Sequence, residues 1–117
     1  MQLNLNQEKV GQKSIEWAAG LFEGEGTITH HSNRPDKPKL AINMTDLDVM
    51  QSFATSIGYG NVTGPYPYKT RPQNKPCYRW EVGKKVEVIR ILKLLLPFFG
   101  KRRKQRAEQA LYQLLIK

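Results

Sequence analysis

The sequence predicts an α+β fold with a single antiparallel sheet that is covered by helices on one face. Apolar residues switch between the 3.6-residue spacing of a helix and the two-residue spacing of a strand. The resulting order is helix, two strands, helix, two strands, two helices. Because the strands come in two hairpin-like pairs separated by a helix, one antiparallel sheet is the natural assembly. A chain of 117 residues is expected to form one domain, residues 1–117.

Two helices are predicted in the N-terminal half. Ser14 is positioned to cap the first helix, and we expect the glycines Gly24 and Gly26 to end it. Thr45 begins the stretch TDLD, which resembles a capping box with Asp in place of Glu. The second helix is therefore expected to start at Thr45 and to end at Gly58.

Two further helices are predicted near the C-terminus. Residues 84–96 carry apolar side chains at core spacing, and Pro97 and Gly100 interrupt this pattern. Residues 101–116 form a last helix that is basic at its start and apolar later.

Four segments alternate in the manner of strands or are rich in residues that favour strands. These are residues 27–32, 39–44, 59–68 and 78–82. The stretch NRPDKP at 33–38 is predicted to be a turn or loop, and residues 65–77 are predicted to be a proline-rich loop. In the last strand, Trp80 lies on the face opposite to Arg79 and Glu81. We expect Trp80 to face the helices and the charged pair to face outward.

The charge is distributed unevenly along the chain. Residues 1–59 hold five Lys or Arg and seven Asp or Glu, whereas residues 60–117 hold fourteen and three. The net charge is +9, and the sequence pI is about 9.9. This asymmetry indicates a polyanionic partner, most often nucleic acid. The alternative is a basic surface that serves solubility alone.

Membrane and secretory functions are not indicated. The first ten residues lack the basic start and apolar run of a signal peptide. The most apolar stretch, residues 86–99, contains Arg90, Lys93 and Pro97 and is too short to span a bilayer. The single cysteine, Cys77, excludes an internal disulfide and a cysteine-based zinc cage. We expect a reducing compartment, either the cytoplasm or an organellar matrix or stroma, and no membrane partner.

The first helix has a second face that its own sheet does not need. Gly20 and Gly24 are four residues apart and share this face, with Trp17 and Leu21 beside them. Small residues at this spacing allow a second helix to approach closely. A chain with one such helix can satisfy the face by forming a two-fold dimer. Such a dimer would bring two copies of Glu25 together near the symmetry axis.

Paired carboxylates are ligands for hard divalent cations such as Mg²⁺. Backbone carbonyls freed at the helix end, such as that of Gly24, can add to the shell. A cation between a carboxylate and a phosphate can activate water and stabilise the leaving oxygen. A nucleic-acid duplex is itself two-fold related, so one carboxylate per subunit would give one centre per strand.

The stretch AAGLFEGEG at 18–26 resembles the LAGLIDADG motif of homing endonucleases. Gly20 and Leu21 stand in its GL, Glu23 and Glu25 replace its two aspartates, and Gly26 is its final glycine. Four later features follow the layout of the family in order. They are MTD at 44–46, GYGNV at 58–62, YRWEV at 78–82 and LLPFFGKRRKQRAEQAL at 95–111. The resemblance therefore covers most of the chain.

The resemblance implies an αββαββα fold whose four-stranded saddle sheet lies along the major groove of DNA. Members with one motif act as homodimers that pair through the motif helices. The implied activity is Mg²⁺-dependent hydrolysis of both strands of a long, pseudo-palindromic DNA site, and Mn²⁺ or Ca²⁺ can occupy the same metal site. An association with introns also follows from the resemblance.

The resemblance also implies roles for individual residues. Glu25 matches the metal ligand, and Glu23 matches an acid that is mainly structural near the helix end. A basic residue after LLP orients solvent near the phosphate, and here it is one of Lys101, Arg102 and Arg103. The register favours Arg103, whereas a one-residue gap would favour Arg102. Glu25 is one methylene longer than Asp and must fold back to hold the same metal.

Outward strand positions and hairpin loops are expected to contact DNA. Arg and Lys suit guanine edges and phosphates, and Asn and Gln suit adenine. The candidates in the first strand pair are His30, Asn33, Arg34, Lys37 and Lys39. Those in the second pair are Lys69, Arg71, Gln73, Asn74, Lys75 and Arg79. For each of them, a solvated surface position is the competing interpretation.

Two other functions are compatible with the same fold. One is a non-catalytic DNA-binding regulator, and the other is a maturase that binds intron RNA. Glu25 distinguishes them from the endonuclease, because neither binder needs a carboxylate at this position.

Overall fold

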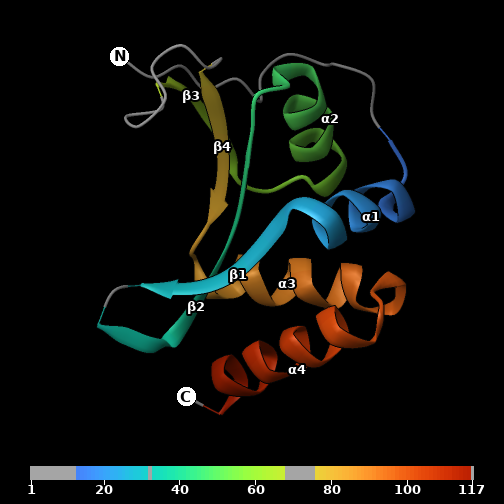
Figure 1. Cartoon of the computed structure of the whole chain (residues 1–117). Coiled ribbons are helices and arrows are strands. Elements are labelled where there is room, and N and C mark those ends of the chain that lie inside the picture. The colour runs from blue at the N-terminus through green and yellow to red at the C-terminus, as the bar shows by residue number, and fades with distance from the viewer. Residues whose placement is uncertain (1–12, 32, 68–75, 117) are drawn as a thin grey trace.

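The computed structural model describes residues 13–31, 33–67 and 76–116 (Figure 1). The elements follow the predicted order. They are α1 (Ile15–Glu25), β1 (Gly26–His31), β2 (Arg34–Met44), α2 (Leu47–Ile57), β3 (Asn61–Tyr66), β4 (Cys77–Val82), α3 (Lys85–Leu95), the short 3₁₀ helix η2 (Leu96–Phe98) and α4 (Lys101–Leu115). None of the helices within the described ranges is long and apolar enough to cross a membrane.

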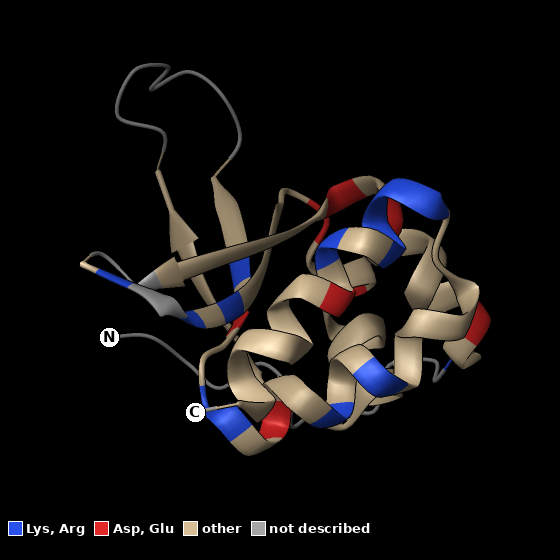
Figure 2. Ribbon diagram, turned by 90° about the horizontal axis from the view of Figure 1, so that it is seen from below, with Lys and Arg blue, Asp and Glu red and all other residues tan. Residues whose placement is uncertain are grey.

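The four strands form one antiparallel sheet in the order β1-β2-β4-β3. Strands β2 and β4 are distant in the sequence but pair with each other at the centre of the sheet. They thereby join the two hairpin-like halves. The helices gather on one side of this sheet, and its other face is left open (Figure 2). The predicted α+β class with helices on one face is therefore confirmed.

The core lies between the sheet and the helices. Trp80 of β4 is fully buried, and the rings of Phe22 and Phe53 meet it edge-on at centroid distances of 6.5 and 4.8 Å. Such aromatic pairs stabilise by about 0.5–1.5 kcal/mol beyond their area burial. The indole Nε1 of Trp80 donates to the carbonyl of Tyr59 at 2.9 Å, so its polar atom is satisfied. Trp80 thus faces the helices, as its position in the strand predicts.

Helix α1 starts as predicted and runs further than predicted. The hydroxyl of Ser14 accepts a hydrogen bond of 3.0 Å from the third backbone N–H of the helix. Gly24 does not end the helix, because one helical glycine costs only about 1 kcal/mol. The helix ends at Gly26, whose N–H donates to the carbonyl of Phe22. A Cβ at Gly26 would lie 2.5 Å from the ring of Phe22, so this close approach requires glycine.

The predicted turn at 33–38 is wrong for most of its length, because β2 already begins at Arg34. Arg34, Pro38 and Lys39 pair with β1 alone, with a register shift between Arg34 and Pro38, and pairing with β4 begins at Leu40. A strand segment that is paired on one side tolerates proline, whose missing N–H need not interrupt a ladder. The prolines of this segment therefore misled the sequence-based prediction.

The N-cap of helix α2 lies one residue later than its capping pattern predicted. Asp46, not Thr45, is the N-cap, and it makes no side-chain cap hydrogen bond. The predicted end is confirmed. Gly58 has φ +82°, and its N–H donates to the carbonyl of Ala54 at 2.8 Å. Glycine adopts this left-handed conformation without the cost that a Cβ imposes.

Candidate metal site and nucleic-acid interface

The two glutamates at the end of α1 have different surroundings. The carboxylate of Glu23 accepts a hydrogen bond from the N–H of Gly100, directly before α4. Its Oε2 lies 3.7 Å from Nε of Arg103, and its carbonyl accepts from Nη2 of Arg103 at 3.0 Å. The Arg103 guanidinium also lies 5.4 Å from the ring centroid of Phe22. Glu23 and Arg103 thus join the end of α1 to the start of α4.

Glu25 is exposed, and its side chain makes no hydrogen bond or ion pair with any described residue. It is the last residue of α1, where the backbone dipole places partial negative charge. The carbonyl of Gly24 lies in the same turn, beyond the last intrahelical donor. This donor set consists of oxygens alone, which fits a hard cation such as Mg²⁺.

One chain offers little beyond these oxygens for holding a metal. Across residues 13–31, 33–67 and 76–116, His, Cys, Asp and Glu side chains form no group of three or more that could hold an ion. A cation at Glu25 would therefore draw further ligands from water, from a bound phosphate or from a second copy of the chain.

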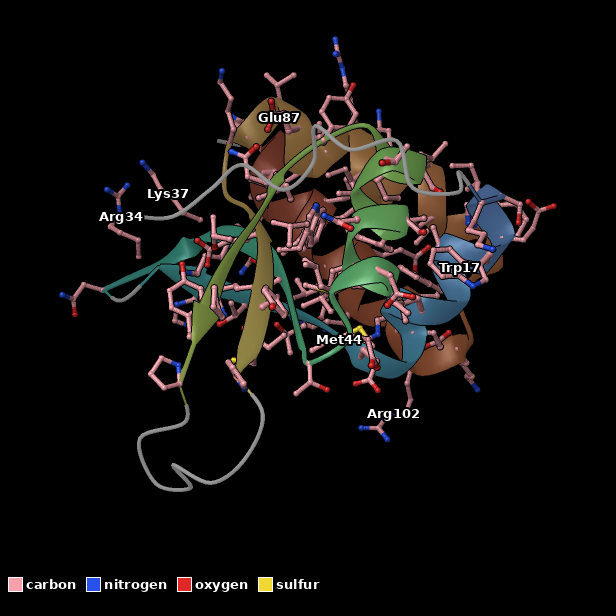
Figure 3. All side chains as sticks on the ribbon, turned by 90° about the horizontal axis from the view of Figure 1, so that it is seen from above. Trp17, Arg34, Lys37, Met44, Glu87 and Arg102 are labelled. Atoms are coloured by element: carbon pink, nitrogen blue, oxygen red, sulfur yellow. The ribbon has the colours of Figure 1, made fainter. Side chains whose placement is uncertain are left out.

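The glycine face of α1 is uncovered. Apart from the adjacent residues and the backbone of the helix itself, no atom of the described residues lies within 4 Å of a Cβ built at Gly20 or Gly24. Both glycines are exposed, whereas Trp17 and Leu21 are half-buried against the core. Figure 3 shows Trp17 on α1 at the edge of the molecule, away from the sheet. The structure thus places all four predicted interface residues on α1 and leaves room beside its glycines.

The three candidate basic residues at the start of α4 differ in availability. Arg103 is half-buried and held by Glu23. Lys101 and Arg102 are exposed, and Figure 3 shows Arg102 pointing away from the body of the protein. Arg102 is therefore better placed than Arg103 to meet a phosphate.

An open depression of about 440 Å³ lies beside this helix start. It is lined by Glu23, Arg102, Arg103 and Arg106. Nη2 of Arg106 donates to the carbonyl of Ile28 at 3.2 Å and thereby ties α4 to β1. Sequence reasoning missed Arg106. The available signal is its spacing, since Arg102 and Arg106 are four residues apart on one helix and share a face.

Lys39 and Arg79 lie on the open face of the sheet, as predicted. Nη1 of Arg79 donates to Oδ1 of Asn43 at 3.1 Å, and Nζ of Lys39 lies 3.3 Å from Oε2 of Glu81. Partial burial raises the pKa of Glu81. The hydrogen bond from Arg79 and the charges of Arg79 and Lys39 lower this pKa by more than burial raises it. The net effect is a pKa below the usual value of 4.5.

Other polar residues on the open face were not among the predicted DNA contacts, although Glu81 was predicted to face outward. They are Thr27, Thr29, Asn43, Asn61, Thr63 and Glu81. The sequence feature that could have identified these outward positions is their alternation with core residues. Asn61 and Thr63 flank the buried Val62, and Thr27 and Thr29 flank Ile28, which packs against the core.

The structure describes only some of the remaining candidate DNA contacts in the hairpins. Arg34 and Lys37 extend from the far end of the β1–β2 hairpin (Figure 3), and Asn33 in its turn has φ +66°. His30 is exposed, but its pairing with the buried Pro38 puts it on the helix-facing side of the sheet. The other five candidates lie outside the described residues. They are Lys69, Arg71, Gln73, Asn74 and Lys75.

The sheet, its one-sided helical layer and the acid-bearing end of α1 together define the fold of the homing endonucleases. The homing endonuclease I-TnaI superimposes with a TM-score of 0.66 and 13% identity, covering 90% of this chain and 74% of that one. I-CvuI, solved with its target in the presence of 2 mM Ca, gives 0.63 and 17% identity over 86% of this chain.

A second I-CvuI structure holds an I-CreI target with 2 mM Mg and gives a TM-score of 0.61 and 18% identity over 86% of this chain. The present chain covers about 65% of the length of I-CvuI. No protein-family profile matches the chain, and no curated protein matches it in sequence. The expected fold is thus confirmed by structure, at a level of identity where sequence alone gives no match.

Proposed function

We propose that the chain acts as a homodimeric, divalent-metal-dependent endonuclease on double-stranded DNA. The observation that carries this proposal is the contrast between its two neighbouring glutamates. Glu23 is held by Gly100 and Arg103, whereas the Glu25 side chain is exposed and has no hydrogen-bond or ion-pair partner among the described residues. A carboxylate left unpaired at the negative end of a helix favours binding of a cation. The homing-endonuclease fold supports DNA as the substrate.

Each part of the site has a task in this proposal. Glu25 and the Gly24 carbonyl hold Mg²⁺, and Mn²⁺ or Ca²⁺ can take its place. The bound cation supplies charge stabilisation for the attacking water and the leaving oxygen. Arg102 binds the scissile phosphate and neutralises its charge. Glu23 and Arg103 act through geometry, because they fix the start of α4 relative to Glu25.

Two copies of the chain would complete the enzyme. Packing through the open face at Gly20 and Gly24 brings the two Glu25 side chains toward one axis. Each subunit then acts on one strand of the duplex. The open face of each sheet, which carries Lys39 and Arg79, lies against a half-site of a long, pseudo-palindromic sequence.

The test uses supercoiled plasmids that carry a randomised insert library, with Mg²⁺ or with EDTA. The native chain is expected to linearise a subset of plasmids only with Mg²⁺, and sequencing the ends identifies the site. Glu25→Gln should bind the recovered site and leave it uncut. Glu108→Gln on α4 removes the same charge from an exposed residue and should cut normally.

The outcomes separate the competing functions. Tight duplex binding without cleavage at any insert would instead support a DNA-binding regulator. Preference for a structured intron RNA over duplex DNA would support a maturase. Equal cleavage by Glu25→Gln and the native chain would contradict the assignment of Glu25 as the metal ligand.

A further inference from the structure

An acidic residue, Glu81, lies between the basic residues Lys39 and Arg79 on the open face of the sheet. Oε2 of Glu81 accepts from both Nε and Nη2 of Arg79, with an Nε–Oε2 distance of 3.1 Å. The same oxygen lies 3.3 Å from Nζ of Lys39. Strand register brings these groups together, because Glu81 pairs with Ala41 and Arg79 pairs with Asn43 on the neighbouring strand.

Glu81 and Asn43 fix the orientation of the Arg79 guanidinium. Glu81 engages Nε and Nη2, and Asn43 engages Nη1, so three of the five N–H groups of Arg79 have partners. On each terminal nitrogen one N–H has no acceptor among the described residues. Both N–H groups lie in the guanidinium plane that Glu81 and Asn43 hold, and guanidinium donors match the O6 and N7 acceptors of guanine in the major groove.

The same contacts reduce what Arg79 and Lys39 can do without sequence selectivity. Free Arg and Lys side chains bind phosphates of any sequence and displace counterions. The side chains of Lys39 and Arg79 are 22% and 33% exposed, and that of Glu81 is 40% exposed, so all three lie at the surface that DNA would meet. Because Glu81 is ionised at neutral pH, its charge offsets one of the two cations.

We propose that Glu81 is a specificity-determining positioning residue, which holds Arg79 for guanine readout and restrains Arg79 and Lys39 from binding phosphates of any sequence. This inference rests on the proposed function, since it assumes that duplex DNA lies on the open face. Glu81 itself acts through Arg79. Its loss should therefore weaken selectivity while strengthening general affinity.

The experiment compares the native chain, Glu81→Gln and the matched control Glu108→Gln. Each selects sequences from a library of randomised DNA duplexes, and each is titrated with one mixed-sequence duplex over a range of salt concentrations. The control makes the same change in net charge on α4, away from the open face. Urea unfolding verifies that each variant is folded.

For Glu81→Gln, the preference for guanine at one position of each half-site should fall by about tenfold. Its affinity for the mixed-sequence duplex should rise severalfold, and the slope of log K against log salt should steepen by about one unit. Glu108→Gln should change none of these three quantities: the guanine preference, the affinity or the salt slope. In Arg79→Ala, which removes the side chain that Glu81 orients, the added Glu81→Gln change should have no further effect on the guanine preference.

Two results would overturn the inference. One is an unchanged guanine preference and salt slope in Glu81→Gln while the native chain selects a defined site. The other is an equal effect of Glu81→Gln and Glu108→Gln, which would reduce the role to net charge. Failure of the native chain to select any duplex sequence would be different, because it would overturn the proposed DNA function and the inference with it.

Discussion

Glu23 and Glu25 lie two residues apart in the sequence, and the structure gives them different surroundings. Glu23 contacts α4 through Gly100 and Arg103, whereas the Glu25 side chain has no hydrogen bond or ion pair with a described residue. A residue that stabilises the fold and a residue that holds a ligand should respond differently to the same chemical change. The pair therefore provides a test in which each variant is the control of the other.

We predict that Glu23→Gln lowers the free energy of unfolding by about 1 kcal/mol, since it weakens a charged hydrogen bond and a partly exposed ion pair. Glu25→Gln should leave it within about 0.5 kcal/mol of the native value. Urea unfolding followed by circular dichroism measures both. A larger loss for Glu25→Gln than for Glu23→Gln would contradict the assigned roles.

Glycines in the same helix should also respond differently. Gly26→Ala places a Cβ 2.5 Å from the buried ring of Phe22 and is expected to destabilise the protein by about 1–3 kcal/mol. Gly20→Ala meets open space within a helix and should stabilise the protein by about 0.5–1 kcal/mol. Thermal unfolding at low protein concentration measures both effects, and equal destabilisation by the two variants would refute the packing argument.

Glu81 gives a prediction for pH. Its pKa in the folded protein lies below the ordinary value, so its stabilising contacts are fully present above pH 4.5 and are lost as pH falls through the lowered pKa. Glu81→Gln should therefore be less stable than the native chain at pH 7. The difference should shrink as pH falls toward about 3 in urea unfolding. A difference that grows on acidification would contradict this direction.

At the scale of an element, α1 carries two packing surfaces. Ala18, Ala19 and Phe22 are buried against the core, and the face with Gly20 and Gly24 is open. The helix can gain or lose a partner on its open face without a change in its own fold. This property makes self-association separable from stability.

We predict that Gly20→Leu weakens self-association by at least tenfold while the chain stays folded, because the added side chain keeps two helices apart. Sedimentation equilibrium at micromolar concentration measures association. The control Gln105→Leu adds a similar side chain to an exposed position on α4 and should associate normally. A monomeric native chain at this concentration would contradict the proposed dimer.

At the scale of the whole molecule, most of the positive charge comes from residues 60–117, and the fold places part of it on the open face of the sheet and part at the start of α4. Arg79 lies on the sheet beside Lys39 of the N-terminal half, and Arg102 lies at the start of α4. Net charge alone would attract any polyanion, whereas this arrangement favours a duplex that contacts both surfaces.

The salt dependence of DNA binding should report this arrangement. We predict that Arg102→Ala reduces the slope of log K against log salt by about 0.9, the value for one lost phosphate contact. Lys93→Ala on α3 removes an exposed charge from the helical layer and should leave the slope unchanged. Fluorescence anisotropy with a duplex at several salt concentrations provides the slopes, and equal slopes for the two variants would contradict the proposed contact.

Local patterns in the sequence determined much of this protein. The order of elements, the inward position of Trp80, the Ser14 cap and the Gly58 end follow from side-chain periodicity and local backbone chemistry. The motif at 18–26 also pointed to the homing-endonuclease fold. These features could be predicted because each depends on residues close together in the chain.

The tertiary structure decided the features that depend on distant partners. It extended β2 back to Arg34, because β1 pairs with both Pro38 and Arg34. It separated Glu23 from Glu25 because Gly100 and Arg103 reach only the first. It placed Glu81 between Arg79 and Lys39, which are 40 residues apart in sequence and adjacent only through strand register. Such contacts join residues that local patterns cannot relate, so folding alone determines which charges remain available for a ligand.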